Sequence, residues 1–483
     1  MPVVQNWTVL LPEVALVGGA IFLLLLDAAK PSQRGPHLAF ITLASLIASA
    51  VLAYMQWGHA PKAALGGMVV GDNFGVFARL IILGAAALAT LTAPGYLRSR
   101  GLDRAEFYAL LLLSTSGMTL LAVSTDLIMV FIAVELLSLA LYVMAGFERG
   151  RLEAQEASMK YFLLGAFASA FLLYGIAFIF GGTGTTNLLR IQTVASLGGL
   201  PDFRLVGLAV ALIAVGLGFK AAMVPFHMWT PDVYEGSPTP VTAFMAGGTK
   251  AAAFAALLRV LVLALPDFRW DWQGPLVALT VLTVVFASVI AVAQTDVKRM
   301  LAYSSISHAG FVAIAVVAAS RSGVAAALVY LLVYTAMTIG AFGCVMLFRE
   351  GEGERVHLAK YSGLGVKRPA AAALFAFFLF SLAGIPPTGG FWAKWYVFFA
   401  AIRSHQTWLA VVAVGASVIA AFFYVRVAVV MFMQDPPEGD DMPLDRSIGL
   451  RIALALCLLT VIAVGVAPGL FLHLAEKALP FGG

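Results

Sequence analysis

Charged residues are scarce in this chain of 483 residues: Asp, Glu, Lys and Arg make up 11% of it, and apolar residues make up 61%. Soluble domains usually carry about a quarter charged residues. The apolar excess is larger than one soluble core can bury, so it excludes an ordinary soluble enzyme. The formal charge of +5 then reports on membrane orientation and does not indicate a nucleic-acid partner, because basic residues gather in cytoplasmic loops.

Cysteine is nearly absent, and so are the motifs of cofactor-binding proteins. Cys344 and Cys457 lie far apart in apolar runs, which predicts packing and excludes a disulfide framework or a cysteine metal site. The sequence has no Gly-rich dinucleotide motif, no phosphate-binding motif and no haem-type histidine pair. It therefore predicts that the chain itself holds no cofactor and no metal, and that any redox chemistry belongs to partner proteins.

Long apolar runs dominate the sequence instead. A membrane-spanning helix needs about 20 apolar residues, and that length divides the chain into about fourteen helices. The predicted fold is therefore an all-α polytopic membrane protein. The predicted helices lie near residues 8–29, 37–57, 73–94, 107–123, 127–146, 156–180, 205–230, 239–265, 275–294, 300–319, 324–348, 370–402, 407–433 and 449–472.

Lysine and arginine are distributed unevenly between the predicted loops. If the N-terminus lies outside, the loops that fall inside carry about twice as many basic residues as the others, and they include Arg98, Arg100, Arg151 and Lys298. Cytoplasmic loops are enriched in basic residues. This distribution predicts that both termini lie on the outer side of the membrane, which would be the periplasmic side of a bacterial inner membrane.

Prolines interrupt two of the predicted helices. The first interruption contains Pro225 and Pro231, and the second is the run Pro386-Pro387-Thr-Gly-Gly390. Proline removes a backbone donor and clashes with the preceding turn, so both helices should be broken. Broken backbone at membrane depth persists only inside protein or beside a hydrated cavity. A simple proline kink is the alternative, especially at the first site.

The two breaks divide the chain into matched units. Helices four to eight form one unit and helices nine to thirteen the other, and the fourth helix of each is the broken one. Because five is odd, the second unit enters the membrane from the opposite side, as in the inverted repeats of secondary transporters. A Thr-Asp dipeptide recurs at 125–126 and 295–296. The predicted domains are an N-terminal three-helix segment (1–104), a first repeat (105–266), a second, inverted repeat (267–434) and a C-terminal helix (435–483).

Five charged residues interrupt the apolar segments where hydrocarbon is expected: Glu135, Lys160, Lys220, Lys250 and Lys394. Charges at bilayer depth are costly, rare and usually functional. One carboxylate cannot neutralise so many lysines, and burial disfavours the charged ammonium. Bases in this situation can take up and release protons, so the row predicts a proton path.

Each of these residues also has a less specific interpretation. Glu135 suits a structural ion pair, and Lys160 lies only about a turn into its helix, so its ammonium can reach the interface. His227 and His308 lie in membrane segments beside polar residues. Histidine titrates near physiological pH, so both are candidate proton carriers, although a hydrogen-bonded structural histidine is equally compatible with the sequence.

Three arginines, Arg79, Arg259 and Arg426, also fall within apolar runs. Arginine does not deprotonate in proteins. These residues are therefore predicted to be ion-pair partners or helix-end anchors, and they are not predicted to carry protons.

A family resemblance rests on Glu135, Lys160, Lys220, the break Pro225-Phe-His227-Met-Trp229, Lys250 and the run from Gly384 to Lys394. Together they resemble the antiporter-like subunits of respiratory complex I, the NADH–quinone oxidoreductase, which are related to multisubunit cation/proton antiporters. The resemblance covers essentially the whole chain. Within the family, the length of this chain suits fourteen helices with no long lateral helix, which favours the N-type branch over the L type. Lys394, where M-type chains carry glutamate, favours it over the M type, and the first three helices favour a bacterial source.

The resemblance implies a function in the membrane arm of a proton-translocating NADH–quinone oxidoreductase. FMN, iron–sulfur clusters and quinone would be bound by partner subunits. The implied partners are the antiporter-like M-type subunit, small K- and J-type subunits and the lipid bilayer. The alternatives are a subunit of a multisubunit Na⁺/H⁺ antiporter or membrane-bound hydrogenase, and a purely structural membrane subunit with inert buried pairs.

The resemblance also implies a role for each buried residue. Glu135 and Lys220 would form the ion pair of a first half-channel, with Lys160 beside them. Lys250, together with His227, would form the central link. Lys394 would be the terminal lysine of the second half-channel.

Overall fold

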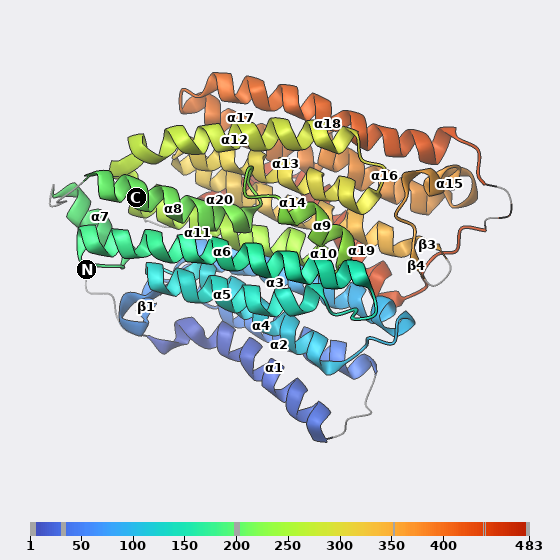
Figure 1. Cartoon of the computed structure of the whole chain (residues 1–483), viewed down its shortest axis with the longest axis horizontal. Helices are drawn as coiled ribbons and strands as arrows, with labels where there is room; N and C mark the ends of the chain where they lie inside the picture. Colours follow the sequence, from blue (N-terminus) through green and yellow to red (C-terminus); the bar gives the residue numbers. More distant parts are fainter. Residues whose placement is uncertain are drawn as a thin grey trace.

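Long helices lie side by side in a single bundle (Figure 1). The computed structural model describes residues 6–29, 35–197, 203–350, 353–437, 439 and 441–479. Within these residues, 12 helices are long and apolar enough to cross a membrane, and two shorter apolar helices cover Leu205–Ala221 and Pro369–Ala383. This confirms the predicted class, an all-α polytopic membrane protein, while the number of crossings stays a prediction.

The helices are α1 (Leu11–Ala29), α2 (Pro36–Tyr54), α3 (Asn73–Ser99), α4 (Ala105–Val123), α5 (Leu127–Ala145), α6 (Leu152–Thr183), α7 (Leu188–Ser196), α8 (Phe203–Ala221), α9 (Trp229–Gly236), α10 (Thr239–Phe244), α11 (Lys250–Leu257), α12 (Arg269–Val292), α13 (Val297–Ala318), α14 (Arg321–Leu347), α15 (Leu364–Lys367), α16 (Pro369–Ala383), α17 (Gly389–Arg403), α18 (Thr407–Met433), α19 (Ile448–Val466) and α20 (Pro468–Lys477). The segments Met245–Thr249 and Leu258–Ala264 are π-helical.

Two short antiparallel hairpins close opposite ends of the bundle (Figure 1). One pairs β1 (Lys62–Ala64) with β2 (Val69–Gly71), and the other pairs β3 (Arg349–Glu350) with β4 (Gly353–Glu354). We call these ends the β1–β2 end and the β3–β4 end. The described chain both begins and finishes at the β1–β2 end, where the Asn73 side chain donates to the Lys477 carbonyl (3.1 Å). This arrangement fits the expectation that both termini share one side of the membrane.

Both predicted interruptions are present. Helix α8 stops at Ala221, and α9 begins at Trp229 on the far side of the first break. Helix α16 stops at Ala383, and α17 begins at Gly389. A side chain at Gly390 would lie 1.8 Å from the Ser381 carbonyl oxygen, so only glycine permits this close approach. The chain therefore leaves the helical path at both sites, which is more than a proline kink.

The two Thr-Asp dipeptides occupy equivalent places at opposite ends of the bundle. Asp126 caps α5, and the backbone of Thr125–Leu127 pairs with 186–188. Asp296 caps α13, and the backbone of Thr295–Val297 pairs with 356–358 in the same way. Helices α5 and α13 are the second helices of the two predicted units. An inverted repeat would place equivalent residues of the two units at opposite ends of the bundle in this way.

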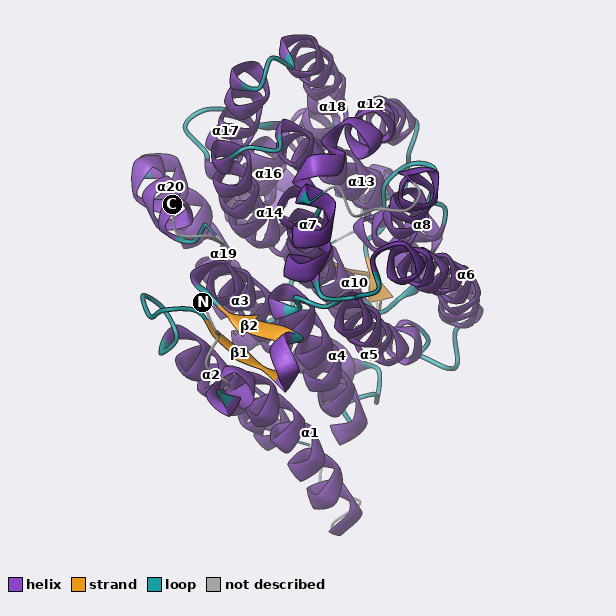
Figure 2. Cartoon of the chain, turned by 90° about the vertical axis from the view of Figure 1, so that its left-hand side faces the viewer, coloured by secondary structure: helices purple, strands orange, loops and turns teal. Residues whose placement is uncertain are grey.

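The centre of the bundle consists of the helices that carry the candidate site. Viewed along the bundle, α1 and α2 lie at one edge, α17 and α18 at the opposite edge, and α10 and α14 between them (Figure 2). Almost every residue of α10, α11, α13 and α14 is buried. Polar side chains in the middle of these helices are therefore inside protein and face neither lipid nor bulk water.

Candidate functional site

Glu135 and Lys220 lie in the same part of the first unit, but they do not touch. Glu135, on α5, accepts a hydrogen bond from the Ser169 hydroxyl of α6. Lys220, at the end of α8, is only 2% exposed and lies within electrostatic range of Glu135. Among the described residues, no carboxylate oxygen lies within ion-pair distance of the Lys220 ammonium. The direct ion pair implied by the family resemblance is therefore not formed.

Aromatic rings surround Lys220 instead. Its ammonium lies 5.2 Å from the ring centre of Tyr142, 5.1 Å from that of Tyr161 and 5.3 Å from that of Phe219. Tyr161 stacks on Trp229, the first residue of α9, with 4.4 Å between ring centres. Cation–π contacts of this kind stabilise a charged ammonium without a counter-ion. They also connect the lysine before the break to the helix after it.

Lys160 is not a buried base, so the expectation of a charge at bilayer depth is wrong for this residue. Its side chain is 40% exposed and pairs with Glu156 (2.6 Å) and with Asp232 of α9 (2.5 Å). Asp232 also binds Arg299 of α13 (2.8 Å). The position near the start of α6 lets the ammonium reach the β3–β4 end, which is the alternative that the sequence left open.

His227 lies buried in the first break. Its ring packs edge-on against Phe286 of α12, with 5.2 Å between ring centres. Within the described part of the chain, Nδ1 of His227 has no hydrogen-bond partner, and no hydrogen bond joins this residue to Lys250. The structure therefore does not bring together the pair that the resemblance assigns to the central link.

Lys250 is positioned by the π-helical turn Met245–Thr249, which it directly follows. Such turns often occur at functional sites because they redirect the following side chains. The Lys250 ammonium is 2% exposed, donates to both the carbonyl and the hydroxyl of Ser305 on α13, and lies 5.6 Å from the Tyr334 ring centre. Neutral oxygens alone hold this ammonium among the described residues, with no carboxylate at ion-pair distance.

His308, one turn beyond Ser305 on α13, makes hydrogen bonds through both ring nitrogens. Nδ1 lies 2.7 Å from the Tyr330 hydroxyl, and Nε2 lies 3.3 Å from the Tyr424 hydroxyl. Ser304 also bonds to Tyr424. A histidine held between two hydroxyls can exchange a proton on either side.

Tyr334 connects Lys250 to His308. Its hydroxyl lies 2.7 Å from the Ser305 hydroxyl, and its ring centre lies 5.2 Å from that of His308. Thus His308, and not His227, contacts the residues that surround Lys250.

Lys394 is held by the second break. Its ammonium is 5% exposed and donates to the Ala383 carbonyl (2.8 Å) and the Ser417 hydroxyl (2.7 Å). Ala383 is the last residue of α16, so its carbonyl is free because the helix stops there. The ammonium also lies 4.8 Å from the ring centre of Phe311. Again, within the described chain, no carboxylate accompanies the buried lysine at ion-pair distance.

Sequence reasoning missed the tyrosine hydroxyl groups between the lysines. Serine and tyrosine hydroxyls both donate and accept hydrogen bonds, so they can pass protons between bases. The available signal was tyrosine inside apolar helices, most clearly at the i, i+4 spacing of 330 and 334. The buried tyrosines of this region are Tyr142, Tyr161, Tyr234, Tyr330, Tyr334 and Tyr424.

Replacing Tyr334 by phenylalanine tests this connection. The change removes one hydrogen bond to Ser305, worth about 1 kcal/mol. We expect proton translocation in membrane vesicles to slow by about fivefold, the factor that corresponds to this free energy. Tyr174→Phe on the exposed face of α6 is the matched control. Equal rates in the two variants would remove Tyr334 from the path.

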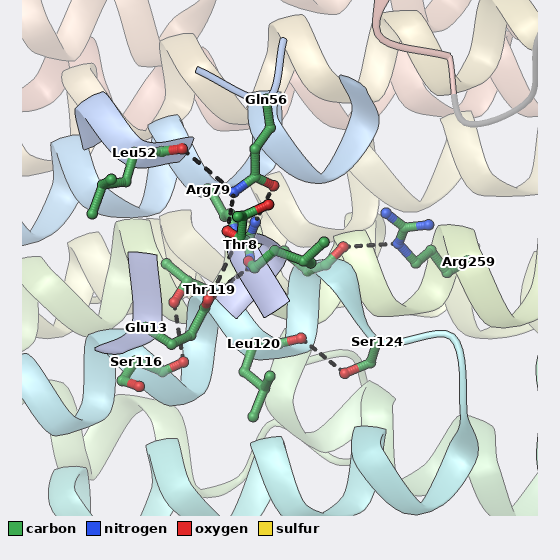
Figure 3. Close-up of polar contacts among 12 residues, drawn as sticks. Thr8, Glu13, Leu52, Gln56, Arg79, Ser116, Thr119, Leu120, Ser124 and Arg259 are labelled. Atoms are coloured by element: carbon green, nitrogen blue, oxygen red, sulfur yellow. Dashed lines mark hydrogen bonds and ion pairs between the residues drawn. The ribbon is translucent and has the colours of Figure 1, made fainter. Parts of the chain in front are cut away.

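Two buried arginines form ion pairs away from this path, as the sequence predicted. Arg79 of α3 binds both carboxylate oxygens of Glu13 of α1 at 2.8 Å (Figure 3). Arg259 binds both oxygens of Asp72 at 3.0 and 2.6 Å. Arg426 donates to main-chain carbonyls at the end of α12, as an anchor does. Arg79 and Arg259 thus have carboxylate partners, whereas Lys220, Lys250 and Lys394 have none at ion-pair distance among the described residues.

Known proteins resemble this chain over most of its length. A family profile described as NADH:quinone oxidoreductase/Mrp antiporter, TM, matches residues 124–420. The chain is 43% identical over 476 residues to NADH-quinone oxidoreductase subunit N 1 of Herpetosiphon aurantiacus, which covers 98% of this chain and 96% of that protein.

Two solved structures share the whole fold. A chain of respiratory complex I from Thermus thermophilus with bound aureothin matches with a TM-score of 0.80 at 37% identity, over 96% of this chain and 99% of that chain. A chain of the membrane-bound sulfane sulfur reductase, an archaeal respiratory membrane complex, matches with a TM-score of 0.84 at 27% identity, over 98% of this chain and 97% of that one.

Proposed function

The chain belongs to the membrane-subunit family of NADH:quinone oxidoreductases and Mrp antiporters, and from that premise we propose that it is the N-type proton-translocating subunit of a bacterial NADH–quinone oxidoreductase. Electron transfer from NADH to quinone takes place in partner subunits that hold FMN and iron–sulfur clusters. This chain moves protons across the inner membrane in response, beside an M-type subunit and small K- and J-type subunits.

One observation carries the proposal: Lys220, Lys250 and Lys394 are buried with neutral oxygens or aromatic rings around them. A buried ammonium with a carboxylate partner is held in its charged form, whereas one without a partner is close to losing its proton. Each lysine can therefore alternate between ammonium and amine. Because a charge on one raises the energy of a charge on the next, protonation at one end favours release at the other.

The order of groups supports a path across the middle of the bundle. Lys220 contacts Tyr161, which stacks on Trp229. The Tyr234 side chain, one turn beyond Trp229 on the same helix, lies within interaction range of Ser305, which binds Lys250. The second half of the path is the set Tyr334, His308, Tyr424 and Lys394. Glu135 modulates Lys220 from the first unit, and Lys160 and His227 lie at the edge of the path.

The proposed orientation places the β1–β2 end on the periplasmic side and the β3–β4 end in the cytoplasm. The basic loops around Arg100, Arg151 and Arg368 lie at the β3–β4 end. Enrichment of basic residues on the cytoplasmic side supports this assignment. The proposed inverted units, 105–266 and 267–434, then cross the membrane in opposite directions, and each contains one broken helix.

Lys394→Met tests the proposal in the assembled complex. We expect NADH-driven proton uptake into inverted membrane vesicles to fall by about tenfold, because a thioether cannot carry a proton. Lys62→Met changes a lysine of strand β1, at the β1–β2 end and away from the path. This variant removes the same charge and should pump normally. Normal numbers of protons per electron in Lys394→Met would contradict the proposed role.

The second candidate function is cation/proton exchange, and dependence of proton flux on sodium distinguishes it from the first. The Mrp antiporter part of the family description makes cation exchange a defined alternative. Hard cations need several oxygen ligands, whereas the path described above offers lysines. Proton translocation by the complex should therefore not require sodium, and sodium-dependent proton flux would favour the antiporter instead.

A further inference from the structure

Lys298 is a buried base that the path above does not use. The sequence analysis placed it in a loop, but it lies in the first turn of α13 and is 2% exposed. Its ammonium donates to the Ser237 carbonyl (2.9 Å), and no carboxylate of the described chain lies within ion-pair distance. It thus shares the character of Lys220, Lys250 and Lys394 while lying near the β3–β4 end.

A charged cavity of about 630 Å³ opens at that end, and Lys298 forms part of its lining. The walls of this cavity carry titratable side chains. Burial raises the pKa of the Asp296 carboxyl above its ordinary value. One oxygen of Glu354 accepts from Thr239 (2.6 Å), and the other has no partner among the described residues. Besides Lys298, the titratable and charged groups of the walls are Arg100, Glu148, Arg151, Glu153, Glu235, Asp296, Glu354 and His357.

Polar groups lead from Lys298 toward the central lysine. The Ser237 hydroxyl beside it is fully buried and has no partner within the described residues. Buried polar groups of this kind are usually satisfied by water. Tyr234, one turn earlier on α9, lies within interaction range of Ser305, which holds Lys250. Ser305 lies two turns from Lys298 on the same face of α13, about 10 Å away at 1.5 Å per residue.

We propose that this cavity is the aqueous mouth through which protons reach Lys250, and that Lys298 takes them from the cavity. A carboxylic acid of the wall gives its proton to the neutral Lys298 amine, leaving a carboxylate and an ammonium. The ammonium then passes a proton to water at Ser237, which regenerates the amine. The inference rests on the proposed function, because it assumes that Lys250 carries protons.

Two substitutions separate a proton-transfer role from a structural one. Lys298→Met removes both the charge and the exchangeable proton, whereas Lys298→Arg keeps the charge but cannot deprotonate. If Lys298 transfers protons, both variants lower NADH-driven proton translocation by about tenfold. If its charge only supports the fold, Lys298→Arg restores the rate, and the proposal fails. Lys250→Met in the same complex is the reference: a defect there with normal rates for Lys298→Met overturns this inference alone.

Thiol labelling tests the cavity without depending on the Lys298 variants. Cys344 and Cys457 are both buried, so a cysteine introduced at Glu354 offers the accessible thiol. A charged, membrane-impermeant methanethiosulfonate should modify Glu354→Cys in inverted vesicles, where the cytoplasmic face is outside. Proton translocation should drop when the reagent is added, relative to the same vesicles before addition. Failure to label from that face, or labelling without a drop, would show that the cavity is not the proton mouth.

Discussion

Lys250→Met is expected to lower NADH-driven proton translocation by about 100-fold, the lower range of what a positioned acid or base contributes. Methionine fills nearly the same volume as lysine, and the Ser305 hydroxyl keeps its bond to Tyr334 (2.7 Å). The substitution therefore removes the proposed proton carrier, while the Ser305 hydroxyl keeps a partner and the Ser305 carbonyl lies within helix α13. The measurement is proton uptake into inverted vesicles per NADH oxidised, with the amount of assembled complex determined in parallel.

Two control substitutions at the same position identify the property that matters. Lys250→Arg retains a fixed positive charge that cannot deprotonate, so it should be as defective as Lys250→Met. Lys250→His retains a titratable group and should keep part of the activity. Restored pumping in Lys250→Arg would mean that the charge alone is needed, and a normal ratio of protons to electrons in Lys250→Met would refute the carrier role.

The local features of this fold were predictable from sequence because their causes are local. Proline and glycine chemistry predicted both helix breaks, and the position of Lys220, Lys250 and Lys394 inside apolar segments predicted their burial. Boundaries were less certain, and at one place this mattered. The predicted helix 300–319 begins at Val297 in the structure, and that small shift takes Lys298 out of the loops and into the protein interior.

The partners of the buried residues could not be predicted, because helix packing decides them. Lys250 meets Ser305, which is 55 residues away in the chain, and Lys160 meets Asp232, which is 72 residues away. No pattern in a single sequence specifies such pairs. The same limit explains why His227 was expected beside Lys250, whereas His308 lies there through Tyr334.

The structure also separates two kinds of buried charge that look alike in sequence. Arg79 and Arg259 each bind both oxygens of a carboxylate, so their charges are compensated and fixed. The buried lysines of the path have no such partner in the described chain. A buried charge with an oppositely charged partner stays charged and supports the folded structure. A buried, titratable group without such a partner can change its protonation state. We therefore expect the presence of a carboxylate partner to distinguish supporting charges from proton carriers.

Arg79→Met should accordingly destabilise the protein without a specific effect on pumping. It leaves the Glu13 carboxylate buried without its cation, which costs about 3–5 kcal/mol, so the amount of assembled complex and its thermal inactivation temperature should both fall. The double variant Glu13→Leu/Arg79→Met replaces the pair by apolar groups and should recover much of the loss, because a buried ion pair is often no more stable than its apolar replacement.

Proton translocation per assembled complex gives the decisive comparison. The pair lies at the β1–β2 end between α1 and α3, with Gln56 and Thr119 beside it (Figure 3). It makes no contact with the central lysines among the described residues. The double variant should therefore pump at the normal rate per complex, whereas Lys250→Met should assemble and pump about 100-fold more slowly. If the double variant assembled normally and lost pumping, Glu13 and Arg79 would belong to the path. The presence of an ion-pair partner would then not distinguish structural charges from proton carriers.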